Sequence, residues 1–289
     1  MRILLLTTHL NRGGIGIYTV NLARYLKKKG IEVGVASSGG DLVSVLGREG
    51  ITHHYLNIRT KSEFGIKVFK ALPRLTALIN DKRYDIVHAQ TRVTQILASM
   101  AGRWTGIPFV STGHGFFNHR RLSRRLFPCW GEKVVAISNS VKEHLINDLA
   151  ARPEKVEMIY NGIELERYRS VGSAKDEKLA EDMGLDERML TVGTIGRLSS
   201  VKGYKYLISA LKEVVDSGCN VQLVMVGEGP EEDNLKDQIR DLDLEDKVFV
   251  TPGEVSLEKY MTLFDIFCLP SIHEGLGLSL MEAMAAGRA

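Results

Sequence analysis

Long hydrophobic runs and clustered cysteines are both missing from this 289-residue sequence. No apolar run approaches the roughly 18 residues that a membrane-spanning helix needs. The apolar start at residues 1–6 is too short for the core of a signal peptide and is typical of a buried strand. We therefore expect a protein that stays in the cytoplasm. Cys129, Cys219 and Cys268 lie far apart and form no CxxC pair, which favours reduced thiols over disulfides or a zinc site.

Internal repeats and low-complexity tracts are also absent from the sequence. What is present is the composition of a globular protein, 44% hydrophobic and 25% charged, in a chain long enough for two domains. The net charge of +3 is unevenly distributed. Residues 1–170 hold 26 basic and 13 acidic side chains, a balance of +13, whereas the remainder balances at −10. This asymmetry predicts two domains with different partners.

Short apolar segments alternate with helical patterns through the first half of the chain. Apolar runs without polar alternation are typical of strands buried on both faces. Their alternation with helices, such as Ile17–Lys29 and Arg92–Thr105, predicts right-handed βαβ units in a parallel sheet. The expected strands are Ile3–Thr8, Glu32–Ala36, Ile86–Ala89, Phe109–Thr112, Val134–Ile137 and Val156–Ile159.

A charged, weakly periodic stretch at residues 164–189 separates this series from a second one. We place the boundary in this stretch, with domains at 1–168 and 169–289. A final helix is expected at Ser279–Ala286, ended by Gly287. A parallel sheet would normally receive another strand there, so we expect the second domain to be incomplete. The strands expected in this domain are Leu190–Ile195, Val221–Val226, Val248–Val250 and Ile266–Leu269.

The first candidate site is a glycine-rich turn, Asn11–Gly16, between an expected strand and a helix. Glycine lets a backbone approach a ligand closely, and the N–H groups at a helix N-terminus favour an anion. Gly14 and Gly16 fit the start of a dinucleotide-binding fingerprint, but Thr19 holds the third glycine position and Glu32 opens the second strand instead of closing it. A binding loop and a simple tight turn therefore both remain open.

A histidine flanked by two glycines, His114, follows the strand expected at Phe109–Thr112. In open parallel sheets, ligands bind beyond the carboxyl ends of the strands. A lone histidine is more often structural, but this position favours a functional role.

Two cations, Arg197 and Lys202, follow the first strand of the second series and precede a helix. An arginine fork and a lysine point charge beside a helix N-terminus suit a diphosphate. The segment is no Walker A loop, because the GxxxxGK[ST] pattern is missing. The alternative is a solvated basic turn.

The last motif combines two carboxylates with a glycine-rich helix start. Glu274 precedes Gly275, Leu276 and Gly277, and Glu282 lies in the helix that follows. Carboxylates are acceptors suited to sugar hydroxyls, and the helix N-terminus favours a phosphate between them. The motif predicts that the two carboxylates hold the two ends of a nucleotide sugar. The alternative is one helix-capping and one surface glutamate.

These segments, in this order, resemble the family-4 retaining glycosyltransferases of GT-B fold along nearly the whole chain. The pair Glu274 and Glu282, with its GxG interior, is the most specific match, and Asp85–His88, Ile137–Ser140 and Tyr160–Ile163 add to it. The resemblance implies an α/β protein of two Rossmann-like domains whose parallel sheets face a cleft. The N-terminal domain would take the acceptor and the C-terminal domain the nucleotide sugar.

The resemblance also implies a role for each candidate residue in the C-terminal domain. Arg197 and Lys202 would bind the donor diphosphate, with the helix start at Gly275–Gly277. Glu274 would contact the transferred sugar, and Glu282 would contact the ribose.

In the N-terminal domain, the resemblance implies that His114 orients the sugar near the reacting centre and that Gly14 and Gly16 close over the phosphates. The donor would be a UDP- or GDP-sugar. A hexosyl group would pass, with retention of configuration, to a glycan or lipid-linked acceptor, as in polysaccharide biosynthesis. The resemblance implies that the reaction needs no metal or other cofactor, and the one DxD pattern, Asp241–Asp243, falls in a charged helix-to-strand stretch.

Two alternative functions remain beside the transferase. A nucleotide-sugar epimerase shares the two-domain architecture. An inactive nucleotide-sugar-binding fragment is the other alternative, because the family pattern implies further elements beyond Gly287.

Basic and apolar residues of the first domain suggest one more partner. We hypothesise that they meet an anionic membrane peripherally, on its inner face, or an anionic acceptor. The alternative is a helix packed on the sheet, with solvated lysines and arginines. Nucleic acid is not expected, because no aromatic platform accompanies the arginines. The residues are an apolar stripe at helical spacing (Phe64, Val68, Leu72, Leu75, Ile79), a basic face (Lys67, Lys70, Arg74) and an arginine cluster (Arg120, Arg121, Arg124, Arg125).

Overall fold

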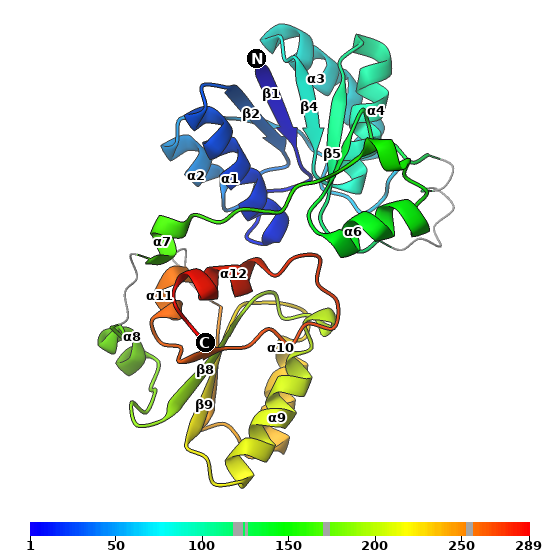
Figure 1. Cartoon of the computed structure of the whole chain (residues 1–289). Helices are drawn as coiled ribbons and strands as arrows, with labels where there is room; N and C mark the ends of the chain where they lie inside the picture. The colour runs from blue at the N-terminus through cyan, green and yellow to red at the C-terminus, as the bar shows by residue number, and fades with distance from the viewer. Residues whose placement is uncertain (118–123, 125–126, 170–173, 253–256) are drawn as a thin grey trace. The chain divides into compact units, whose positions relative to one another are not determined.

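The computed structural model describes residues 1–117, 124, 127–169, 174–252 and 257–289. The chain divides into two units, Met1–Asn161 and Gly162–Ala289, each built around its own parallel sheet (Figure 1). This division precedes the boundary that the sequence suggested after residue 168. The reason is that α7 (Leu165–Arg169) forms a helix that packs against α12 (Leu278–Ala285) of the second unit.

The first unit contains a seven-stranded sheet in the order β3-β2-β1-β4-β5-β6-β7, in which all pairings are parallel. The order reverses direction between β1 and β4, which is the topological switch point of a Rossmann-like sheet. The strands are β1 (Arg2–Leu6), β2 (Glu32–Ser37), β3 (Thr52–Tyr55), β4 (Ile86–Ala89), β5 (Phe109–Gly113), β6 (Val134–Ala136) and β7 (Val156–Met158).

Helices cover both faces of this sheet, because successive β1 side chains point to opposite faces and both faces are apolar. Leu4 and Leu6 join the core formed with α3 (Ile66–Lys82) and α4 (Arg92–Thr105). Ile3 and Leu5 join the core formed with α1 (Gly14–Lys28) and α2 (Val43–Arg48). Near the carboxyl-terminal strands lie α6 (Asn139–Glu143), η1 (His144–Asp148) and η2 (Pro153–Lys155).

Every strand expected from an apolar run is present, but the sequence missed β3. This edge strand reads Thr52-His53-His54-Tyr55, and its residues are half-buried or exposed. It pairs with β2 along its length, from Gly34–Thr52 to Ser37–Tyr55. Because backbone pairing holds the strand, its side chains need not be apolar.

The second unit repeats the same design on a smaller scale. Its four-stranded parallel sheet has the order β10-β9-β8-β11, with the switch point between β8 and β11. One face packs against α9 and α10, and the other against α8, α11 and α12. The elements are α8 (Glu177–Asp182), β8 (Leu190–Ile195), η3 (Ser200–Lys202), α9 (Tyr204–Asp216), β9 (Val221–Val226), α10 (Glu232–Asp241), β10 (Val248–Thr251), α11 (Leu257–Met261) and β11 (Ile266–Phe267).

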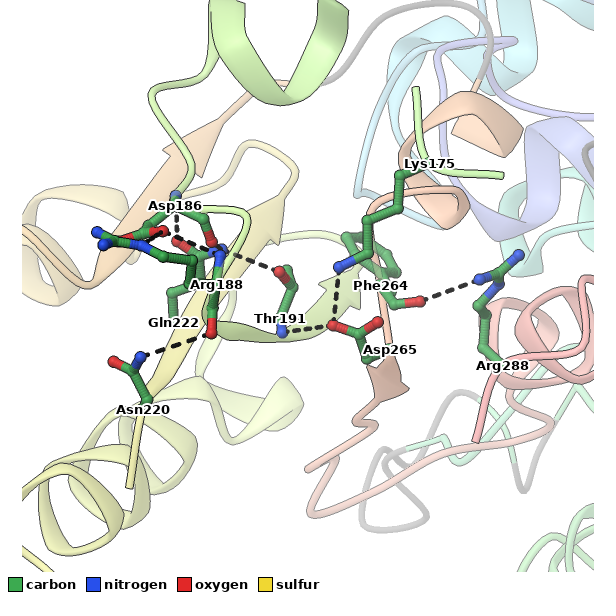
Figure 2. Close-up of polar contacts among 9 residues, drawn as sticks. All are labelled: Lys175, Asp186, Arg188, Thr191, Asn220, Gln222, Phe264, Asp265 and Arg288. Carbon is green, nitrogen blue, oxygen red and sulfur yellow. Dashed lines mark hydrogen bonds and ion pairs between the residues drawn. The ribbon is translucent and has the colours of Figure 1, made fainter. Parts of the chain in front are cut away.

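A polar network ties together the amino ends of these strands (Figure 2). The Asp265 carboxylate, just before β11, accepts from the Thr191 backbone N–H at 2.8 Å and pairs with Lys175 at 3.0 Å. Gln222 of β9 donates to the Thr191 hydroxyl at 3.0 Å and to the Asp186 carbonyl at 3.0 Å. These contacts hold β11 beside β8 at the edge opposite the loops that bind ligands in such sheets.

Candidate functional site

The loops that follow β8 and β11 meet at the switch point of the second sheet. Lys202 ends the turn η3 after β8, and Glu274 lies in the loop after β11. The Lys202 ammonium donates to the Glu274 carboxylate, with 2.5 Å between Nζ and Oε2. Both side chains are partly exposed, so a ligand can reach them. The fold thus places a lysine ammonium, a group that can bind phosphate, beside a carboxylate, a group that can accept from hydroxyls.

Close packing of the two loops fixes this pair. Gly203 has φ 69°, and a Cβ atom there would lie 2.1 Å from the carbonyl oxygen of Pro270. The Ile272 N–H donates to the Val201 carbonyl at 2.9 Å. The Ser271 hydroxyl donates to Glu274 Oε2 at 3.1 Å, which orients the same carboxylate oxygen that Lys202 holds.

The other residues expected in the donor site lie on these loops. Arg197 is exposed directly after β8, on the loop that carries Lys202. Gly275 and Leu276 are half-buried between Glu274 and the start of α12. Gly277 is the N-cap of α12, and a Cβ atom there would lie 2.6 Å from the Leu269 side chain, so the helix start packs tightly against the end of the sheet.

Glu282 lies inside α12 and is only 9% exposed. The Tyr168 hydroxyl of α7 hydrogen-bonds its carboxylate. Burial raises the pKa of Glu282, while Tyr168 and the charge of Arg167 oppose that rise. Burial and the neighbouring Glu282 also raise the pKa of Tyr168. The two carboxylates therefore have separate partners: Lys202 for Glu274, and Tyr168 for Glu282.

The glycine-rich turn of the first unit joins β1 to α1. Gly13 caps α1 with φ 152°. Gly14 is exposed, and a Cβ atom there would meet no other atom within 4 Å. Gly16 is buried, and a Cβ atom there would lie 2.4 Å from the Asn11 carbonyl oxygen. Gly16 is therefore needed by the turn itself, whereas Gly14 leaves open space in front of the helix N-terminus.

His114 follows β5 at the carboxyl edge of the first sheet. Its Nε2 lies 2.9 Å from the Gln90 side-chain oxygen, and Tyr18 of α1 packs edge-on against the ring with 4.7 Å between centroids. Burial lowers the pKa of His114 from 6.5 to about 3, and the nearby His88 adds to this effect. The ring is therefore neutral at physiological pH. Because an amide oxygen only accepts, Nε2 carries the proton and Nδ1 is left as an acceptor.

A second histidine lies beneath this site. His88 of β4 lies with Nε2 2.7 Å from the Thr112 hydroxyl of β5, and burial lowers the pKa of His88 to about 4. The Tyr18 phenol hydrogen-bonds Thr112 as well, and burial raises the pKa of Tyr18. This network connects α1, β4 and β5 below His114.

A third histidine anchors the chain just after His114. The Phe117 N–H donates to His144 Nε2 at 2.9 Å, so the ring proton lies on Nδ1 and is donated to Asp148 at 2.6 Å. His144 is only 6% exposed. The segment from His114 to Phe117 is therefore held at both ends.

Several of these partners were not singled out from the sequence: Tyr18, Gln90, Thr112 and Tyr168. They come from separate elements, and each becomes visible as a partner only when those elements pack together in the fold. The one available signal was the position of Gln90 and His114, each directly after a parallel strand.

The stripe expected to face a membrane is mostly core. Val68, Leu72, Leu75 and Ile79 are buried against the first sheet, as the packed-helix alternative requires. Lys67, Lys70 and Arg74 are exposed, and Phe64 is 44% exposed. Of the arginine cluster, Arg124 is described and 8% exposed, and Arg120, Arg121 and Arg125 lie outside the described residues.

Membrane spans and metal clusters are both missing from the described part of the chain. No helix there is long and apolar enough to cross a bilayer. Nor do the described residues include a group of three His, Cys, Asp or Glu side chains arranged to hold a metal ion.

Solved structures of similar fold are glycosyltransferases of GT-B fold. A glycosyltransferase from Rickettsia africae matches with a TM-score of 0.82 and 26% identity, covering 99% of this chain and 77% of that one. Anabaena Alr3699/HepE, solved with UDP and glucose, matches with a TM-score of 0.82 and 23% identity, covering 100% and 79%. The fold is therefore that of the GT-B glycosyltransferases.

Family models give the narrower assignment. The model for Glycosyltransferase Family 4 matches residues 12–167, and the model for Glycosyl transferases group 1 matches residues 175–289. The chain belongs to glycosyltransferase family 4.

Curated relatives agree with this family. An Escherichia coli UDP-Gal:alpha-D-GlcNAc-diphosphoundecaprenol alpha-1,3-galactosyltransferase is 30% identical over 77% of this chain. The chain spans 61% of the length of that relative. The putative glycosyltransferase EpsF of Bacillus subtilis is 26% identical over 99% of this chain and 77% of its own length.

Proposed function

We propose that the protein transfers a hexosyl group from a nucleoside-diphosphate sugar to an acceptor hydroxyl with retention of the anomeric configuration. The observation that carries this proposal is the Lys202–Glu274 contact at 2.5 Å, at the switch point of a Rossmann-like sheet. The contact supports the proposal because an ammonium can bind a phosphate and a neighbouring carboxylate can accept from sugar hydroxyls.

In the proposed donor complex, the diphosphate takes Lys202 and Arg197 as its cationic contacts, beside the helix start at Gly275–Gly277. Glu274 then exchanges its bond with Lys202 for bonds to the sugar hydroxyls, and Glu282 accepts from the ribose. The N-terminal end of α1, with Gly14 and Gly16, offers N–H groups to the phosphates. The donor is a UDP- or GDP-sugar, and no metal is needed because side-chain cations neutralise the leaving group.

During transfer, the bond between the anomeric carbon and the phosphate oxygen breaks, and a bond from the acceptor oxygen forms on the same face of the sugar. The acceptor proton passes to the departing phosphate oxygen. Cations that stabilise the developing charge on the diphosphate lower the barrier. His114, with a pKa of about 3, is too weak a base to take this proton at neutral pH, so its Nδ1 accepts from a sugar hydroxyl and orients the ring.

The proposed acceptor is a glycan or a lipid-linked saccharide. Support comes from the E. coli relative, whose name specifies a sugar joined to diphosphoundecaprenol. A second line of support is the exposed start of α3, where Ile66 is 73% exposed and Phe69 50% exposed beside Lys67 and Lys70. Apolar side chains flanked by lysines suit the surface of an anionic membrane.

Vesicle co-sedimentation tests the membrane contact. We expect binding to anionic vesicles that falls when Ile66 and Phe69 are both changed to serine. Equal binding to neutral and anionic vesicles would refute the contact without affecting the proposed reaction.

The test of the reaction is transfer from a panel of UDP- and GDP-sugars, with the anomeric configuration of the product read by NMR. We expect a retained configuration, and loss of transfer in Glu274→Ala. An inverted product would refute the mechanism. Epimerisation of the donor with no acceptor present would favour the epimerase, and binding of donors without any turnover would favour an inactive binder.

A further inference from the structure

A cavity of about 400 Å³ opens at the carboxyl edge of the first unit's sheet. Its walls come from loops that follow separate strands: Thr8 after β1, Lys61 after β3, Thr91 after β4 and Phe116 after β5. The cavity therefore occupies the edge where Rossmann-like sheets bind ligands. Its lining residues are separate from those of the proposed donor site.

The charges in the wall are unequal. Three cations, Lys61, Arg92 and Arg124, face one carboxylate, Glu63. Glu63 pairs with Arg92, with 3.2 Å between the guanidinium and carboxylate and both side chains buried. Arg92 also donates to the Pro128 carbonyl at 2.7 Å. The Arg92–Glu63 pair is therefore held by contacts within the protein and forms a fixed part of the cavity wall. The wall as a whole is therefore cationic.

The other two cations, Lys61 and Arg124, differ in how much of the side chain is exposed. Lys61 is exposed at the rim. Arg124 is only 8% exposed, and its guanidinium lies over the Phe117 ring at 4.6 Å from the centroid. This cation–π contact helps to hold the guanidinium in place, and a guanidinium held in place is a good partner for phosphate oxygens.

The remaining lining adds hydroxyl donors and an apolar wall. Thr8, Thr60 and Thr91 supply hydroxyl groups, and Phe116 presents a ring that is 47% exposed. Two cations with several hydroxyl donors suit an anion with many oxygen atoms, and the aromatic wall suits an apolar group attached to it.

We propose that this cavity binds the phosphate or diphosphate group of the acceptor, with Lys61 and Arg124 as its cationic contacts. The inference rests on the proposed function, because it makes the cavity the acceptor side of the transfer. The cavity is lined by Phe116 and Phe117, which follow His114 in the chain. A phosphate bound in the cavity would therefore lie beside the segment that carries His114.

Calorimetric titration of the full chain with inorganic pyrophosphate tests the proposal. The protein carries Lys202→Ala and Arg197→Ala, so that the proposed donor site lacks both of its cationic contacts. We expect Lys61→Gln to weaken binding about tenfold, since a charge-assisted hydrogen bond is worth roughly a decade in affinity. Arg124→Gln should weaken it at least as much. The matched control is Lys29→Gln, which removes the same charge from the exposed C-terminal cap of α1.

Three outcomes would overturn the proposal: no binding of pyrophosphate, equal effects of Lys61→Gln and Lys29→Gln, or equally tight binding of glucuronate, which would assign a carboxylate instead. Farnesyl diphosphate distinguishes the source of the phosphate. Tighter binding than pyrophosphate, lost in Phe116→Ala, would support a lipid-linked acceptor. Equal binding of the two probes would support a soluble phosphorylated acceptor.

Donor binding by the same variants separates this inference from the proposed function. In the chain with Lys202 and Arg197 intact, a nucleotide sugar should raise the melting temperature equally with and without Lys61→Gln. If the donor binds but pyrophosphate does not reach the cavity, the inference fails and the proposed function stands. If no donor binds, the proposed function fails by itself.

Discussion

Acidification should destabilise the first unit through histidines that the fold keeps neutral. Burial lowers the pKa of His88 from 6.5 to about 4 and that of His114 from 6.5 to about 3. Below about pH 6.5 these two histidines become protonated in the unfolded chain but stay neutral in the folded chain, so the unfolded state binds more protons. Stability is therefore fully present above pH 6.5 and falls as the pH drops toward 4.

The magnitude for His88 follows from its pKa. Each pKa unit corresponds to about 1.4 kcal/mol, so lowering the pH from 8 to 5 should cost about 2 kcal/mol through this one ring. That is a large part of the ~5–15 kcal/mol that stabilises a typical domain. His88→Gln keeps a polar partner for the Thr112 hydroxyl, which lies 2.7 Å from His88 Nε2, but cannot titrate.

Tryptophan fluorescence during urea unfolding measures the pH-dependent loss of stability in the first unit, which contains His88. Both tryptophans of the sequence, Trp104 and Trp130, lie in the first unit. We expect the wild-type protein to lose about 2 kcal/mol more than His88→Gln between pH 8 and pH 5. The comparison uses the difference between the two pH values, so a constant cost of the substitution cancels. Equal losses in the two proteins would refute the assignment of His88 as a buried neutral ring.

Two further predictions concern the second unit and can be read by calorimetric unfolding. Gly203→Ala should lower the free energy of unfolding more than Gly218→Ala does. Both glycines have positive φ (69° and 87°), but only at Gly203 would the new Cβ meet backbone, at 2.1 Å from the Pro270 carbonyl oxygen. Equal losses of about 1–2 kcal/mol would mean that only the left-handed backbone conformation matters. Tyr168→Phe should cost about 1–3 kcal/mol, because it removes the hydroxyl partner of the buried Glu282 carboxylate, whereas an unchanged melting temperature would show that another group replaces it.

The fold was predictable where both faces of a strand are buried. A short apolar run such as Val221–Val226 is typical of a strand covered on both faces, and the structure buries it at every position. The edge strand Thr52–Tyr55 could not be found in this way, because its backbone pairing to β2 leaves its side chains half-buried or exposed. The helix Leu165–Arg169 was missed because its packing partner, α12, is more than a hundred residues away in the sequence.

The residues of the candidate site could be predicted from local motifs, but their contacts could not. Lys202 and Glu274 could each be singled out from a local motif, because each follows a strand and precedes a helix. Their contact depends on the approach of Gly203 to Pro270, which no local pattern encodes. The surroundings of His114 were equally hidden, since its partner Gln90 follows a different strand.

The most direct test of the central claim compares nucleoside diphosphate with nucleotide sugar in Glu274→Gln. The substitution removes the carboxylate that holds Lys202 at 2.5 Å and that is proposed to accept the sugar hydroxyls. The matched control is Glu213→Gln on α9. By titration calorimetry, we predict that the diphosphate alone binds as tightly as before or more tightly, while the nucleotide sugar loses at least about tenfold in affinity. Parallel changes for both ligands, or no effect on either, would contradict the account.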